Sequence, residues 1–389
     1  MTAAQLTAPA IVAWGALAIM LYAYLGYPLL LVAFGRVRRP RPILRSEARP
    51  TVTVVVAAWN EEAIIGEKTA NTLTQDYPAD RLDLVVVSDG STDRTDAIVE
   101  EQAGQSARVR LLHTKGRQGK SVALNIGVPA TTGEIVVLTD ANAMFRKEAV
   151  AQLVRPFGDP RVGAVSGQLC YRPGEGLKEG EGFYWRYEQR VKRAESALAS
   201  LLGANGSIYA IRRELFRPLR PRDVNDFVIP YWALLQRRAV ILEEDAISYE
   251  EAAPSLWGEY RRKVRIMARA IPTMISLLWP TLARGRVFLL WQLISHKLLR
   301  EIQGLFFLGM LGGAIGGAAR GDVALALFAA AQVLLYTLGA TAWAAPAVAR
   351  WRAGRLAAHL DMIALASVAA LWLWLTRGVK ATWQPARPG

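Results

Sequence analysis

The chain has 389 residues, 52% of them hydrophobic, and a formal net charge of +14. That length allows two ordinary domains, and the hydrophobic share is high for a protein made only of soluble domains. The positive charge lies beside apolar segments, which favours contact with anionic lipid headgroups and argues against nucleic acid as a partner. Cys170 is the one cysteine of the sequence, so no disulfide can form within the chain, as suits a cytosol-facing domain.

An apolar stretch opens the chain. No charged residue precedes Arg36, and Pro9 to Phe34 is longer than the roughly 20 residues needed to cross a bilayer. A cleavable signal peptide carries its positive charge before the apolar stretch, so we expect residues 1–35 to remain as a transmembrane helix. The positive-inside rule then places the arginine-rich linker, residues 36–50, in the cytoplasm of a bacterial-type inner (plasma) membrane.

Residues 51–256 alternate strands with helices. Five short β-branched runs, of the kind that parallel sheets bury on both faces, are the predicted strands: Thr51–Ala58, Leu84–Ser88, Val109–His113, Ile135–Thr139 and Val162–Gln168. Three helices are predicted between them: Ala63–Gln75, Thr92–Gln102 and Lys120–Ala130. This order predicts an α/β fold with a parallel-rich, Rossmann-like sheet wound on both sides.

The second half of this domain has weaker signals. A loop is predicted over residues 171–180, then a helix over Phe183–Leu201 and a glycine-bearing turn over Gly203–Tyr209. Another helix is predicted near Arg212–Phe216. Asp226 stands just before the apolar stretch Phe227–Leu235.

The last third of the chain has the composition of membrane-associated helices. Residues 257–300 mix basic, aromatic and apolar side chains, which predicts helices that lie in the headgroup plane; a buried amphipathic helix would have the same pattern. Three transmembrane helices are predicted within residues 301–376: Ile302–Ala319, Val323–Ala349 and Leu356–Thr376. His359 and Asp361 weaken the last of these. Four spans would place the tail, residues 377–389, outside, although its basic residues argue against that.

Polar residues follow the predicted strands where those strands end. Glu61 and Asp89 can accept hydrogen bonds from the base and ribose of a nucleotide. Asp140, with Asn142 two residues on, can hold Mg²⁺ or Mn²⁺ on a diphosphate. The carboxyl ends of parallel strands form the edge where open α/β sheets bind ligands. Acidic residues also cap helices and fill turns, so each position alone is a weak signal.

Four further residues are candidates for the same site. Lys120 opens a predicted helix, where a lysine and the helix start both favour an anion. Arg262 and Arg265 are three apart and share a helix face, from which they can clamp a diphosphate. Asp226 is the candidate base for an acceptor hydroxyl. A solvated lysine, lipid contact and a buried structural carboxylate are the respective alternatives.

Together these segments resemble a membrane-bound member of glycosyltransferase family 2. The resemblance covers about Thr51 to Arg269 and rests on AAWNEE, VVSDGSTD, GKSVALN, LTDAN, FYWRYEQ, GANGSIYAIRRELF and NDFVIP. It implies a GT-A domain at residues 51–256 and inverting, metal-dependent transfer from a UDP-sugar. In that family Asp89 and Asp140 bind the donor, and Asp226 matches the catalytic aspartate.

The same resemblance suggests an acceptor side and a substrate class. The acceptor-side candidates are Tyr184, Trp185, Asn205 and Gly206. The membrane helices resemble those of cellulose, hyaluronan and chitin-oligosaccharide synthases, which implies a growing glycan as acceptor. However, the processive motif Q-x-x-R-W appears here as Arg262-Lys-Val-Arg265-Ile266, and Asn225 replaces an acidic residue before the base.

Other functions remain open at this point. A single addition to a lipid-linked acceptor would need the same donor site. A transporter with a regulatory domain would use His359 and Asp361 as intramembrane polar residues, and a nucleotide sensor would need no base. A dinucleotide oxidoreductase is disfavoured because no G-x-G-x-x-G follows the first strand. The sequence does not identify the donor sugar, the linkage or the oligomeric state.

Overall fold

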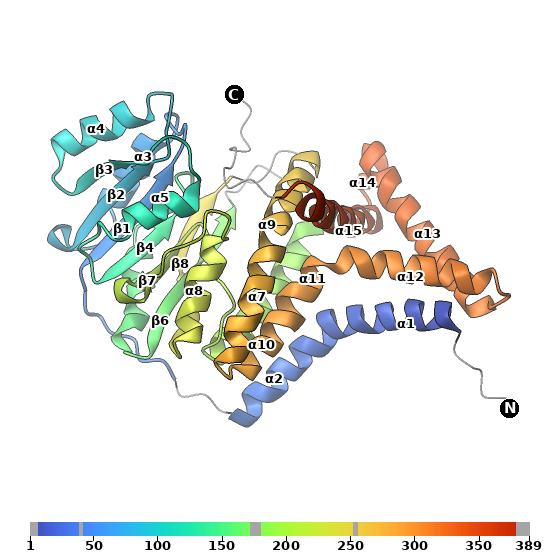
Figure 1. Ribbon diagram of the computed structural model, residues 1–389. Helices are drawn as coiled ribbons and strands as arrows, with labels where there is room; N and C mark the ends of the chain where they lie inside the picture. Colours follow the sequence, from blue (N-terminus) through green and yellow to red (C-terminus); the bar gives the residue numbers. More distant parts are fainter. Residues whose placement is uncertain (1–6, 39–41, 172–179, 252–255, 379–389) are drawn as a thin grey trace.

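The computed structural model describes residues 7–38, 42–171, 180–251 and 256–378. Figure 1 shows an α/β domain, a layer of helices beside it, and a group of apolar helices that points away from the domain. The N-terminal helix reaches the far end of this group. Gly378, the last described residue, lies back near the domain, where a Cβ atom placed on it would be 3.8 Å from Arg222.

The domain is built on one mixed sheet of eight strands in the order β3-β2-β1-β4-β7-β6-β8-β5. Its strands are β1 (Val52–Ala58), β2 (Leu82–Ser88), β3 (Val109–His113), β4 (Ile135–Thr139), β5 (Met144–Phe145), β6 (Val162–Tyr171), β7 (Tyr209–Arg212) and β8 (Ala239–Glu250). Strands β3, β2, β1 and β4 are parallel, as the sequence predicts. All five predicted strands are confirmed.

Three further strands were not predicted from the sequence. Strand β7 is antiparallel to both β4 and β6, and it includes Arg212, where the sequence predicts a helix. Only a short 3-10 turn, Arg213–Leu215, follows it. Strand β8 pairs parallel to β6 with a register shift near Ser166, and β5 pairs antiparallel with β8.

Helices cover both faces of the sheet. One apolar core joins the strands to α5 (Lys120–Gly127), α8 (Asn225–Leu235) and the middle of α9 (Leu256–Ala283). The other joins the strands to α3 (Ile65–Leu73), α4 (Thr95–Gln105) and α6 (Ala149–Val154). Burial on both faces explains why the central strands consist of continuous apolar runs.

A layer of helices separates the sheet from the apolar group. It contains α7 (Gly180–Ala197), α9, and a helical run composed of α10 (Val287–Gln292), the π-helical segment η5 (Leu293–Leu298) and α11 (Leu299–Glu301). Helix α9 runs for 28 residues and contains Pro272 and Pro280 in its interior. Its Met274 and Leu277 pack into the core of the α/β domain.

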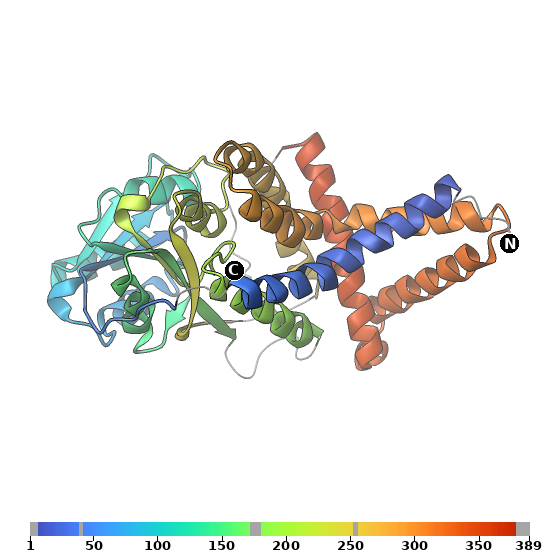
Figure 2. The same cartoon turned by 90° about the horizontal axis from the view of Figure 1, so that it is seen from below.

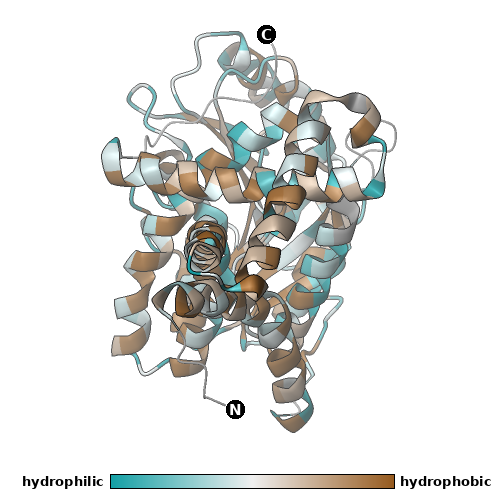
Figure 3. Cartoon of the chain, turned by 90° about the vertical axis from the view of Figure 1, so that its right-hand side faces the viewer, coloured by the Kyte–Doolittle hydropathy of each residue, from teal (hydrophilic) through white to brown (hydrophobic). Residues whose placement is uncertain are grey.

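The apolar group begins with α1 (Ala8–Leu21), the π-helical segment η1 (Tyr22–Gly26) and α2 (Tyr27–Arg38), which together make one long helix. It continues with α12 (Gln303–Ala318), α13 (Val323–Ala344), α14 (Pro346–Ala349) and α15 (Arg352–Thr376). In the described part of the chain, four helices have the length and composition to cross a membrane, or five if the bent pair Val287–Glu301 and Gln303–Ala318 is one span. Figure 3, viewed from the end that points away from the domain, shows these helices coloured largely as hydrophobic residues, with hydrophilic ones between them.

The helices of this group do not all run in one direction. Helix α12 lies alongside α1, and both point away from the domain (Figures 1 and 2). Helix α15 is seen almost end-on in Figure 1, where α1 and α12 are seen from the side, so α15 runs across them. It packs against α9 through Met362, Ile363 and Ala366. The composition of α15 therefore suits a span, but its direction differs from that of α1 and α12.

Candidate active site

Two predicted acidic residues meet at the edge of the sheet. Asp140 directly follows β4, and Asp226 is the second residue of α8. Both face the backbone of Gly206: a Cβ atom placed on Gly206 would lie 3.1 Å from Oδ2 of Asp226 and 3.6 Å from Oδ2 of Asp140. A side chain at position 206 would crowd the carboxylates, so glycine keeps the space between them open.

Lys120 contributes a positive charge to this pair. It is the first residue of α5, and its Nζ lies 2.5 Å from Oδ1 of Asp140. Burial raises the pKa of the Asp226 carboxyl, and the nearby Lys120 charge opposes that shift. The predicted residues Lys120, Asp140, Asp226 and Gly206 are therefore together in space.

Asp89 has a different environment from the other two aspartates. Its carboxylate is fully buried and accepts hydrogen bonds from the backbone N–H groups of Gln118 and Gly119, both at 2.8 Å. The hydroxyl of Thr114 donates a third at 3.1 Å. Asp89 thus holds the loop that leads into Lys120, and its predicted contact with the nucleotide stays a prediction. Glu61 is also buried, and its own N–H donates to Thr95 Oγ1 at 2.8 Å.

The arginines of α9 approach the site from the layer of helices. Arg262 donates to both carboxylate oxygens of Glu259, at 2.7 and 2.8 Å. Arg265 interacts electrostatically with Asp140. Arg269, which the sequence did not single out, donates to the carbonyl of Asp223 at 3.0 Å and acts on Asp226. Arg265 and Arg269 thus act on the two aspartates of the site, and the predicted contact of Arg262 and Arg265 with a diphosphate stays a prediction.

The acceptor-side candidates are divided between two places. Asn205 lies in the turn beside Gly206, where its side-chain oxygen accepts from the N–H of Ser207 at 3.3 Å. Tyr184 and Trp185 lie instead on α7. The hydroxyl of Tyr184 accepts from Arg300 at 3.3 Å, in the layer of helices.

Sequence reasoning missed two titratable neighbours of Asp140. Burial, with the Asp140 charge nearby, raises the pKa of Glu250 to about 7. Burial lowers the pKa of Lys68 to about 7. The Lys68 ammonium donates to Thr139 Oγ1 at 3.1 Å and to the carbonyl of Ala143, and so fixes the loop that carries Asp140. Glu250 ends β8, a strand that the sequence did not predict.

The donor set at Asp140 suits a hard divalent cation. Asp140 offers a carboxylate and the exposed Asn142 an amide oxygen, and oxygen ligands are those that Mg²⁺ and Mn²⁺ prefer. The Lys120 ammonium forms an ion pair with Oδ1 of Asp140. Among the described residues no group of three or more His, Cys, Asp or Glu side chains is arranged for a metal. Other ligands would come from a diphosphate and water.

Comparison with known proteins defines the class of this site. Residues 53–220 match the family described as glycosyl transferase family 2. The fold matches that of a mannosyltransferase from Pyrobaculum calidifontis, solved with GDP-mannose and Mn²⁺, at a TM-score of 0.69 and 25% identity over 94% of this chain and 99% of the other. The chain thus carries a domain, residues 53–220, that matches the family 2 glycosyltransferases, in a GT-A-like fold that is joined to several apolar helices.

Curated relatives share this domain. A β-monoglucosyldiacylglycerol synthase from Nostoc is 34% identical over 158 residues, which are 40% of this chain and 34% of that protein. An N-acetylglucosaminyltransferase from Azorhizobium caulinodans is 29% identical over 178 residues, 44% of each chain. The chain thus matches less than half the length of these relatives.

Proposed function

We propose that this protein transfers a sugar from a nucleoside diphosphate sugar, with inversion at the anomeric carbon, to a hydroxyl of a lipid acceptor at the membrane surface. The observation that carries the proposal is the meeting of Asp140, Asp226 and Lys120 around Gly206. The three groups provide a cation site, a base and a positive charge in one place, as a transfer from a diphosphate leaving group requires.

On the donor side the charges act on the leaving group. Asp140 and Asn142 would hold Mg²⁺ or Mn²⁺, which supplies Lewis-acid stabilisation of the departing diphosphate. Lys120, Arg265 and Arg269 add positive charge around the same place. Glu61 and Asp89 remain our candidates for hydrogen bonds to the nucleotide base and the ribose of the donor. The family resemblance favours UDP, and the mannosyltransferase solved with GDP-mannose adds GDP to the donors worth testing.

On the acceptor side Asp226 takes the proton. Its carboxylate lies beside Asp140, so a hydroxyl that hydrogen-bonds to Asp226 would be close to the anomeric carbon of a bound donor. Attack from the side opposite the diphosphate inverts the configuration at that carbon. The pKa of Asp226 is raised by burial, which makes the carboxylate a stronger base.

A lipid acceptor agrees with the position of the site. The stretch of α9 that contains Arg265 and Arg269 packs against the apolar helix α15 through Val264, Met267 and Ile271, and the following turns pack into the core of the domain. The diacylglycerol in the name of the Nostoc relative is a lipid of this kind. Extension of a glycan is the second candidate, since the apolar helices resemble those of polysaccharide synthases and α1, α12 and α13 supply several candidate spans.

The charges also suggest how the chain lies in a plasma membrane. Arg36 and Arg38 lie in the last turn of α2, and Arg352 begins α15. Helix α15 as a whole lies nearer to the domain than the far end of α1 and α12 (Figure 1). The positive-inside rule would place this side, with the domain, in the cytoplasm. With α15 lying across the other helices, three crossings by α1, α12 and α13 would bring the chain back to the side of the domain, whereas the four spans expected from the sequence also count α15, which passes the same test of length and composition.

A nucleotide-release screen tests the proposal. The full chain, purified in detergent, is given a panel of UDP- and GDP-sugars with lipid extract and either Mg²⁺, Mn²⁺ or EDTA. We expect one donor to release nucleoside diphosphate only with a divalent cation, and the product lipid to carry a sugar of inverted configuration by NMR. Release that survives EDTA, or a retained configuration, would contradict it.

A further inference from the structure

A cavity of about 500 Å³ lies where the α/β domain, the layer of helices and the end of α2 meet. Its walls come from the end of α2, the turn after α7, the turn between α8 and β8, and the loop between α9 and α10. Strands β4 and β6 are both antiparallel to β7, so they run in the same direction. The cavity borders Arg161, just before β6, whereas Asp140 follows the end of β4. The cavity and the active site therefore lie at opposite edges of the sheet.

The charged side chains that line this cavity are all basic in the described part of the chain: Arg38, Arg161, Arg237, Arg238 and Arg286. Arg161 pairs with the carboxylate of Asp159. Arg238 lies 4.0 Å from the carboxylate of Glu214. The other three arginines form no ion pair with a carboxylate of any described residue. The cavity thus has an excess of three positive charges, which favours an anion as its ligand.

Arg286 has a hydrogen-bond donor that lacks an acceptor. Its Nη2 donates to the carbonyl of Leu234 at 3.0 Å, whereas its Nε is buried and has no acceptor among the described residues. Buried donors without acceptors are uncommon. Burial and the charges of Arg237 and Arg38 lower the pKa of this guanidinium, so the three arginines are close enough to repel one another. A bound anion would relieve this repulsion and accept hydrogen bonds at the same time.

Arg237 occupies a backbone position that usually holds glycine. The N–H groups of Arg237 and of the next residue donate to the carbonyls of Leu234 and Ala233, at 3.0 and 2.9 Å, which is the Schellman arrangement at the end of α8. This arrangement needs a residue in the left-handed region, and Arg237 has a φ of +62°. A residue with a long side chain is uncommon there. Such strain is concentrated at functional sites, which agrees with a binding role for the Arg237 side chain.

Apolar side chains lie beside the arginines. Val287 lines the cavity and is 66% exposed. Phe288 also lines it, with its ring 5.3 Å from that of Phe34 and 5.8 Å from the guanidinium of Arg38. Phe34 and Val37 are themselves 46% and 85% exposed, at the end of a long helix with the composition of a membrane span. A soluble phosphate compound would leave these apolar side chains in water, whereas the acyl chains of a lipid would cover them.

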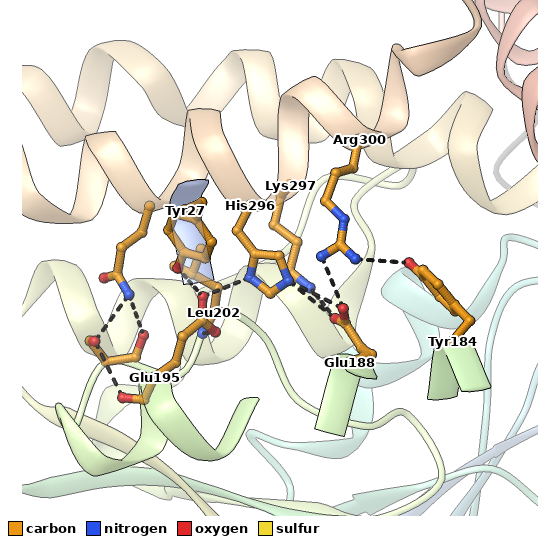
Figure 4. A network of polar contacts seen from close by, with 10 residues as sticks. Tyr27, Tyr184, Glu188, Glu195, Leu202, His296, Lys297 and Arg300 are labelled. Carbon is orange, nitrogen blue, oxygen red and sulfur yellow. Dashed lines mark hydrogen bonds and ion pairs between the residues drawn. The ribbon is translucent and has the colours of Figure 1, made fainter. Parts of the chain in front are cut away.

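A buried ionic network in the layer of helices holds the walls of the cavity in place (Figure 4). Glu188 of α7 lies 3.2 Å from Nε2 of His296 and 3.0 Å from Nη1 of Arg300. It also lies 3.3 Å from Nζ of Lys297. The side chains of His296 and Arg300 are 0% and 7% exposed. The ionic network therefore joins α7 to η5 and α11 by contacts away from water.

Glu195, on the same helix, extends the ionic network to α2. It accepts a hydrogen bond from the Tyr27 hydroxyl at 2.6 Å and lies 2.6 Å from Nδ1 of His296. At the end of α10, Nε2 of Gln292 donates to Oγ of Ser200 at 3.2 Å, and both of these residues line the cavity. Helices α2 and α7 and the run from α10 to α11 are thus fixed to one another. The cavity needs no rearrangement to form, which favours tight binding.

We propose that this cavity binds the headgroup phosphate of an anionic membrane lipid through Arg38, Arg237 and Arg286. Guanidinium groups bind phosphate oxygens by paired, charged hydrogen bonds. The acyl chains would extend over the exposed side chains of Phe34 and Val287. A lipid in this position bridges α2, the turn after α8 and the loop before α10, and so fixes the domain at the membrane surface. This role goes beyond sugar transfer and does not depend on it, because the cavity and the active site lie at opposite edges of the sheet.

Binding of lipid by the full chain, without any sugar donor, tests this proposal. The purified chain is placed in detergent micelles that contain equal amounts of phosphatidylglycerol and phosphatidylcholine, and native mass spectrometry measures the lipids that it retains. We expect mainly phosphatidylglycerol to be retained, and to raise the unfolding temperature more than phosphatidylcholine does. Inorganic phosphate and glycerol phosphate, which lack acyl chains, should displace little of it. If either displaced the lipid as well as added phosphatidylglycerol does, the cavity would be a site for a soluble phosphate compound and the proposal would be wrong.

Single substitutions locate the bound lipid. Arg38→Gln and Arg237→Gln each remove an exposed charge at the cavity, so the fold should persist, and each should weaken the binding of phosphatidylglycerol about five- to tenfold. Arg284→Gln is the matched control. Arg284 is exposed in the same loop as Arg286 but lies outside the cavity, with its guanidinium 5.4 Å from the centre of the Trp232 ring. The control changes the net charge by the same amount and should retain phosphatidylglycerol as wild type does.

Equal retention of both lipids by wild type, unchanged retention in both cavity variants, or the same loss in Arg284→Gln would overturn the proposal. The last of these results would mean that the lipid is attracted by the basic surface in general and not by the cavity. None of these measurements involves sugar transfer, so a failure here is distinct from a failure of the proposed function.

Discussion

Asp226 at the active site and the carboxylates Glu188 and Glu195 of α7 in the helix layer have opposite surroundings. Glu188 and Glu195 each have three donors or cations within hydrogen-bond or ion-pair distance. The Asp226 carboxylate makes no hydrogen bond to the side chain of any other described residue, although it lies beside Asp140. A carboxylate with a full set of partners holds structure, whereas one with unused acceptor positions is available for chemistry.

Asp226→Asn should give the largest effect and test the chemical half of this comparison. An amide of the same shape cannot take a proton, so we expect kcat to fall by about a thousandfold, within the range of general-base catalysis. Donor affinity and thermal unfolding should stay close to wild type, because few contacts are lost. Activity near the wild-type rate would remove Asp226 from the mechanism.

Glu188→Ala tests the structural half. It would leave the buried Arg300 and the partly buried Lys297 without their carboxylate, and breaking a buried pair typically costs about 3–5 kcal/mol. We expect a large drop in the unfolding temperature of the detergent-solubilised chain. Glu244→Ala is the matched control, since its exposed pair with Arg193 should contribute only about 0–1 kcal/mol. Similar unfolding temperatures for the two variants would contradict this difference between the Glu188 cluster and the exposed pair.

Lys120→Met addresses the charge that links the two aspartates. Loss of a hydrogen bond to a charged group costs about 1.5–3 kcal/mol, so we expect a ten- to hundredfold fall in kcat/KM. Lys120 holds the pKa of Asp226 down against burial. The base works deprotonated, so the acidic limb of the rate–pH profile should move to higher pH in the variant. A limb that stays in place would assign that ionisation to another group.

The parts of the fold that sequence predicts are those decided by local pattern. Strands β1, β2 and β4 are continuous β-branched runs because both of their faces are buried. Strand β8 was missed because Glu243, Glu244 and Asp245 interrupt its apolar run at the register shift. In the sequence, three consecutive acidic residues are typical of a loop.

The site residues that could be predicted from the sequence are likewise those that stand in a recognisable local pattern. Asp140 directly follows a strand that can be predicted, whereas Glu250 ends one that cannot. Lys68 was missed because a lysine in a short polar helix suggests an exposed side chain, and this one is fully buried. The ionic network joins residues about a hundred or more positions apart, such as Glu188 and Arg300, so no local pattern contains it.

Glu250→Gln should give the smallest change and the finest test of the site. The pKa of Glu250 is raised to about 7, so its negative charge beside Asp140 develops as the pH rises through neutrality. A cation on Asp140 is attracted by that charge, so in wild type the affinity for Mn²⁺ should increase from pH 6 to pH 8. The uncharged glutamine removes this dependence and leaves affinity nearly flat over that range, near the wild-type value at pH 6. Titration of Mn²⁺ against the transfer rate at each pH measures both curves. If the variant kept the wild-type slope, Glu250 would be no part of the cation site, and the acidic neighbourhood of Asp140 would be reduced to Asp226.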